Sequence, residues 1–115
     1  MMQNLLEQAG FPGVEAEGDS LWARLSATGP EFRADPHGEA WILTLSWPVR
    51  LDAATLARWN SNNPAALLDL AGGETRLRMG AESAADLETW ARAAESMVQT
   101  CLAYRRGQRA RGEGM

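Results

Sequence analysis

The residues from 83 to 106 constrain the fold of this chain most strongly, because their apolar side chains recur with the period of an α-helix. Ser83 and Asp86 resemble a capping box at its start, and Glu88 and Arg92 are spaced to pair one turn apart. The sequence therefore predicts one amphipathic helix of about 25 residues that needs an apolar surface to pack on. Its apolar stripe consists of Leu87, Trp90, Ala91, Ala94, Met97, Val98, Cys101 and Leu102.

Five shorter segments alternate apolar and polar residues, the pattern of β-strands with one buried face. The clearest is 41–47, in which Trp41, Leu43, Leu45 and Trp47 point one way and the residues between them point the other. Segments rich in Gly, Pro and Asp separate the strands and predict turns, so the pairing is expected to be antiparallel. The other four segments are 20–26, the surroundings of 32–34, 66–70 and 75–79.

Two further helices complete the predicted order of elements. Asn4 is expected to cap a short first helix that Gly10 ends, and Asp52 to cap a middle helix that runs through Trp59. The resulting fold class is α+β in the order α-β-β-β-α-β-β-α, an antiparallel sheet with helices packed mainly on one face. Residues 1–106 are predicted to form this single domain, and residues 107–115 a flexible basic tail.

Charge and length narrow the classes of function. The 115 residues carry a net charge of −4, which is spread unevenly: −5 over residues 1–40 and +3 over residues 104–115. An acidic body would be repelled by phosphates, so no nucleic-acid partner is expected. No basic leader precedes an apolar run, and no apolar run is long enough to cross a membrane. We therefore expect a cytoplasmic protein without a membrane partner.

Residues suited to catalysis are few. The only histidine, His37, lies in a predicted turn, and the only cysteine, Cys101, lies on an apolar helix face where a buried thiol is expected. Neither a metal site nor a cofactor is predicted, and no catalytic residue is assigned. An enzyme is thus disfavoured; a small carboxylate-dependent enzyme that uses Asp69, Glu74 and His37 is the less favoured reading.

Four apolar side chains are candidates for contact with a partner protein. Trp41, Trp47 and Trp90 follow apolar faces and are expected in the core, whereas Trp22 and Trp59 are left for either role. Ile42 and Leu67 interrupt the polar sides of their strands, and with Trp22 they are expected to form one exposed apolar patch. The candidate partner-binding residues are Trp22, Ile42, Trp59 and Leu67.

The order of elements resembles the class I type III secretion chaperone fold, which the YbjN-like bacterial proteins share. The most family-like stretch is 56–79, in which a helix that ends in asparagine leads into a hairpin. Its Trp59-Asn60 pair is similar to the YbjN-like group, whereas the small size, the acidity and the closing amphipathic helix are similar to the secretion chaperones.

This resemblance implies a non-catalytic bacterial protein that acts as a homodimer and holds an extended segment of a client protein. The client is expected to add to a sheet edge or to lie on the open face of the sheet. The alternative that the resemblance leaves open is a YbjN-like regulatory or stress-related protein with a cellular partner.

Overall fold

The computed structural model describes residues 1–110 and confirms the α+β class, with nine elements along the chain. Antiparallel strands form a single sheet in the order β1-β2-β3-β4-β6-β5. The predicted order of elements is present, with one additional strand at the start. The elements are α1 (Met2–Gln8), β1 (Glu15–Glu17), β2 (Ser20–Arg24), β3 (Glu31–His37), β4 (Ala40–Trp47), α2 (Ala53–Asn62), β5 (Ala66–Ala71), β6 (Glu74–Ala81) and α3 (Ala84–Ala110).

The additional strand, β1, has three exposed residues and pairs only with β2. β1 is only three residues long and none of them is buried, so its sequence offers no alternating run long enough to predict a strand. Gly18 has a φ of 62° in the two-residue turn that joins β1 to β2, a backbone conformation that glycine adopts without strain. β1 is therefore defined by its pairing partner rather than by its own residues.

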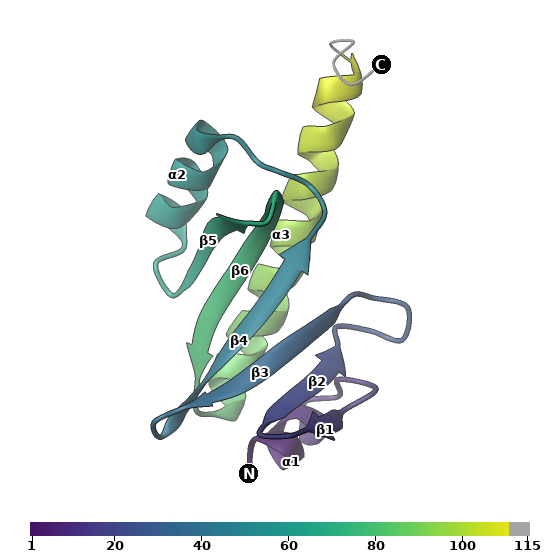
Figure 1. Cartoon of the computed structure of the whole chain (residues 1–115), viewed down its shortest axis with the longest axis vertical. Helices are drawn as coiled ribbons and strands as arrows, with labels where there is room; N and C mark the ends of the chain where they lie inside the picture. The colour runs from purple at the N-terminus through teal and green to yellow at the C-terminus, as the bar shows by residue number, and fades with distance from the viewer. Residues whose placement is uncertain (111–115) are drawn as a thin grey trace.

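The helices α1 and α3 lie on one face of the sheet, and α2 lies beside the edge strand β5 (Figure 1). The long helix α3 packs against the central strands β4 and β6. Met2 and Leu6 of α1 join the same hydrophobic core. The sheet thus has one face covered by helices and one open face.

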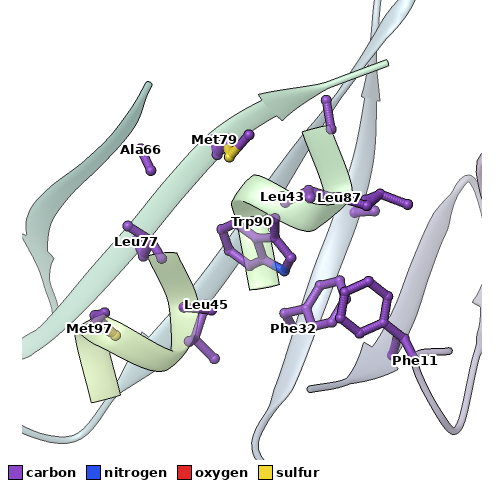
Figure 2. Packing of buried hydrophobic residues seen from close by; sticks show 14 of the residues in the cluster. Phe11, Phe32, Leu43, Leu45, Ala66, Leu77, Met79, Leu87, Trp90 and Met97 are labelled. Carbon is purple, nitrogen blue, oxygen red and sulfur yellow. The ribbon is translucent and has the colours of Figure 1, made fainter. Parts of the chain in front are cut away.

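Trp90 of α3 is the largest fully buried side chain and lies at the centre of the core (Figure 2). Its ring meets Phe32 edge to face at 5.4 Å between centroids, and Phe32 meets Phe11 in the same way at 5.0 Å. The indole nitrogen has no conventional hydrogen-bond acceptor among the described residues. It lies on the side of the indole turned toward Phe32 in Figure 2, an arrangement that allows a weak N–H···π contact.

Two of the three predicted helix starts are confirmed. The Asp52 carboxylate accepts a hydrogen bond from the Thr55 amide at 2.8 Å, and the Ser83–Asp86 box forms in both directions. The first helix begins at Met2, so the prediction that Asn4 caps it is wrong, since Asn4 lies inside the first turn. The last helix continues through Gly107 to Ala110, four residues into the predicted tail; the remaining tail, 111–115, lies outside the described residues.

Candidate functional site

Trp59 belongs to the core, although the sequence left it as a candidate for partner contact. Its side chain is only 7% exposed, and its Nε1–H donates to the carbonyl oxygen of Ala66 at 2.8 Å. The last turn of α2 lies against β5, so the tryptophan reaches over the strand instead of outward. Of the two roles that the sequence left open, this burial favours the core: within the folded monomer, Trp59 has almost no surface to offer a partner.

The neighbouring Asn60 binds the same sheet edge from the same helix. Its Nδ2 donates to the carbonyl oxygen of Leu68 at 3.0 Å, and its Oδ1 accepts from the Leu68 amide at 2.7 Å. A side-chain amide placed in this way satisfies the strand backbone as a further strand would. The Trp59-Asn60 pair therefore closes part of the β5 edge to an incoming strand.

The opposite edge of the sheet is also a poor template for strand addition. It is formed by β1, which is three residues long and carries the exposed side chains of Glu15 and Glu17. Short length and charge are ways in which proteins prevent pairing at a sheet edge. A client segment was expected either at a sheet edge or on the open face of the sheet, and the two edges are thus the less favourable of these places.

The open face of the sheet carries three of the candidate residues, but they do not form one patch. The strand register aligns Trp22, Arg33, Thr44, Arg78 and Leu67 in one row across five strands. Four strand spacings separate the tryptophan from the leucine, about 19 Å. Two arginines lie between them, so the expected continuous apolar patch is absent.

Ile42 lies in the adjacent row of the open face, opposite Asp35 on β3 and Gly80 on β6. It is partly buried, whereas Leu67 is 49% exposed. Beside Ile42, the Arg33 guanidinium forms an ion pair with the Asp35 carboxylate at 2.9 Å, and it also lies over the Trp22 ring. The open face is therefore a mixed polar surface with isolated apolar side chains.

A second ion pair on this face lies at its β5–β6 end. Asp69 accepts two hydrogen bonds from Arg76, at 2.9 and 2.8 Å. The Arg76 guanidinium lowers the pKa of the Asp69 carboxyl below its ordinary value, against the smaller opposing effect of burial. This pairing engages Asp69 structurally and leaves it ill suited to proton transfer near neutral pH.

The helical face contains an apolar groove that the sequence interpretation did not identify. Two hollows of about 300 and 450 Å³ adjoin along α3 and share Leu25 and Ala91 as lining residues. One continues past Pro30 and Val98, and the other reaches the side chains of α1. Together they form one groove between α3 on one side and α1 with the β2–β3 loop on the other.

The sequence contains only a weak signal for this groove. Leu25 follows directly after β2 and stays partly exposed beside the 25–30 turn. Ala91 and Val98 belong to the apolar stripe of α3, but they lie at its margin and are partly buried, unlike Trp90 and Ala94. A stripe wider than the sheet can cover is the feature that could have indicated the groove.

The three residues considered for a carboxylate enzyme are not brought together. His37 lies at the β3–β4 hairpin and Glu74 at the opposite end of β6, and seven residues of extended strand separate these ends by more than about 20 Å. Asp69 is held by Arg76. No cluster of three or more potential metal ligands occurs among residues 1–110.

Cys101 is fully buried on the sheet-facing side of α3, as expected from the sequence. Burial raises the pKa of its thiol to about 11, and the Arg105 charge lowers it only in part. The thiol is therefore protonated at neutral pH, the inert form of a cysteine.

Comparisons with known proteins add no assignment: no family model matches the chain, and neither a curated protein nor a solved structure is significantly similar to it. No helix within residues 1–110 has the combined length and apolar character needed to cross a membrane.

Proposed function

We propose that this protein is a non-catalytic protein-binding module whose groove beside α3 holds an apolar segment of a partner protein. The observation that carries the proposal is the groove itself, which has an apolar floor that continues over two adjoining hollows. Concave apolar surfaces of this kind are where proteins bind peptide segments. The role agrees with the resemblance to secretion chaperones, in which the partner is an exported client.

The sheet edges support placing the partner in the groove rather than on a strand. Trp59 and Asn60 already engage the backbone of β5, and Glu15 and Glu17 are the exposed first and last residues of the short β1. Backbone pairing would have to displace side chains at one edge or bring a strand up to two carboxylates at the other. A segment that packs its side chains into the groove encounters neither obstacle.

A regulatory role of the YbjN-like kind is the second candidate, and it uses the same groove with a cellular partner. The Trp59-Asn60 pair favours it, because this pair is the part of the sequence most similar to that group and the structure gives it a defined contact with β5. A homodimer belongs to both proposals, and light scattering of the purified protein tests it.

Co-purification from the native host with paired variants tests the groove. In the variant Ala91→Gln with Val98→Gln, two polar side chains enter the groove without a change of charge. The matched control, Ala93→Gln with Ser96→Gln, changes the other side of α3, which lines a separate hollow. We expect the wild type and the control to retain the same partner and the groove variant to lose it.

A different pattern of retention would contradict the groove. If Trp22→Ala or Leu67→Gln releases the partner while the groove variant retains it, the open face of the sheet is the binding surface instead. Circular dichroism of every variant ensures that a lost partner reflects the changed surface and not an unfolded protein.

A further inference from the structure

We infer that the segment held in the groove is an amphipathic helix that carries basic residues beside its apolar stripe. This inference rests on the proposed function, and it adds the conformation and the charge of the partner segment. Two independent features of the structure support it: the incomplete helical layer beside α3 and the charges that line the groove.

The helical layer over the sheet is incomplete, because its two helices differ greatly in length. α3 has 27 residues and spans about 40 Å, whereas α1 has 7 residues and spans about 10 Å. The groove starts at α1 and continues along α3 beyond the point where α1 ends, past Leu25 toward Val98. A partner helix laid there would continue the layer on the same face of the sheet (Figure 1).

The dimensions and the lining of the groove suit a helix. The groove is lined by α3 from Ala84 to Gln99, a length of about 22 Å, which corresponds to four turns or about 15 residues of a partner helix. Ala91 lies where the two hollows meet, and its small side chain permits the close approach that helix packing at about 8–10 Å requires.

The charges of the groove indicate which amphipathic helix fits. Among residues 1–110, Glu88 and Glu95 are the only ionisable residues that line the two hollows, and no arginine of this part of the chain does so. They are exposed and lie seven positions apart, about 10 Å along the same side of α3. Arg92, one turn after Glu88, lines a separate hollow between α3 and the α2–β5 loop instead. The acidic lining is therefore specific to the groove.

Both carboxylates remain available to a partner. The predicted pair between Glu88 and Arg92 does not form, since the residues from 1 to 110 show no salt bridge within 4 Å for Glu88 or for Glu95. Lysine or arginine beside the apolar stripe of a bound helix would meet these two carboxylates. An acidic partner helix would bring like charges together at the same positions.

Three synthetic 15-residue peptides test the inference directly. They share one stripe of leucines at helical spacing and differ only in the flanking positions, which carry lysine, glutamine or glutamate. Fluorescence anisotropy of the labelled peptides gives each dissociation constant at about 0.15 M salt, where only nearby charges interact strongly. We expect the lysine peptide to bind wild type about five- to tenfold more tightly than the glutamine peptide, from two exposed ion pairs.

Charge-reversal variants locate the effect in the groove. Glu88→Arg with Glu95→Arg should remove the preference for lysine and favour the glutamate peptide. Glu15→Arg with Glu17→Arg makes the same change in net charge on β1, outside the groove, and should leave the preference unchanged.

The outcomes separate this inference from the proposed function. Equal binding of the lysine and glutamine peptides, or equal loss in both charge-reversal variants, overturns the basic helix and leaves the groove as the binding site. If none of the three peptides binds, or if Ala91→Gln with Val98→Gln leaves their binding unchanged, a helix in the groove is refuted.

Discussion

Replacement of Trp59 by alanine tests whether this residue stabilises the fold or serves only for contact with a partner protein. The indole is 7% exposed, and its Nε1–H binds the carbonyl oxygen of Ala66. Truncation of a buried tryptophan to alanine costs about 3–5 kcal/mol of folding free energy, and the lost hydrogen bond is part of that cost. We therefore expect Trp59→Ala to lower the free energy of unfolding by about 4 kcal/mol.

A second substitution separates the hydrogen bond from the packing. Trp59→Phe keeps an aromatic ring against β5 but removes the donor to Ala66, so it should cost only about 1–2 kcal/mol. This variant also remains informative if Trp59→Ala does not fold, because domains of this size have only about 5–15 kcal/mol of stability in total.

Urea denaturation followed by far-ultraviolet circular dichroism measures these losses without depending on tryptophan fluorescence. Trp22→Ala serves as the control, because Trp22 is a partly exposed tryptophan on the open face whose described polar contact is the Arg33 guanidinium. It should cost about 1 kcal/mol. If Trp59→Ala destabilises the protein no more than Trp22→Ala does, Trp59 does not hold α2 on the sheet, and the assignment to the core is wrong.

Two further predictions concern the edge of the sheet and the start of α3. Asn60→Ala removes both hydrogen bonds to the Leu68 backbone and should lower the free energy of unfolding by about 1–3 kcal/mol in urea denaturation. The control Asn62→Ala, at an exposed residue of the same helix, should change it by less than about 0.5 kcal/mol. Equal losses in the two variants would contradict a stabilising role for the bonds between Asn60 and β5. The amides of Glu82 and Ser83 lower the pKa of the Asp86 carboxyl, so its stabilising effect is full above the ordinary value of 3.8 and is lost as the pH falls through the lowered value. Asp86→Ala should lower the free energy of unfolding by about 1 kcal/mol near neutral pH, and this loss should shrink as the pH falls below 3.8. If urea denaturation gives the same loss at neutral pH and in acid, the Asp86 carboxylate does not stabilise the start of α3 through its charge.

Most elements of the fold could be predicted from local patterns. The alternation at 41–47 and the helical period of 83–106 each require one buried face, and both elements form with the expected faces inward. β1 could not be predicted, because none of its residues is buried and its existence depends on pairing with β2. The end of α3 was placed too early, since Gly107 weakens a helix without ending it.

The candidate site was predicted less well, because it depends on contacts between segments far apart in the chain. The sequence could place Trp22, Ile42 and Leu67 on polar strand faces, but only the strand order puts Arg33 and Arg78 between the first and the last of them. Trp59 was undecided for a similar reason: whether a tryptophan at a helix end is buried depends on what lies beside that end, and here β5 does.

The sequence by itself determined the fold class, the acidic body and the apolar stripe of α3, because these follow from composition and from the periods of helix and strand. The tertiary structure decided where a partner has room to bind. Asn60 reaches the backbone of Leu68, and Leu25 and Ala91 come to line the same groove, only after the chain has folded. These arrangements bring together segments that are far apart in sequence, so the closed edges and the open groove leave at most a weak signal in the order of residues.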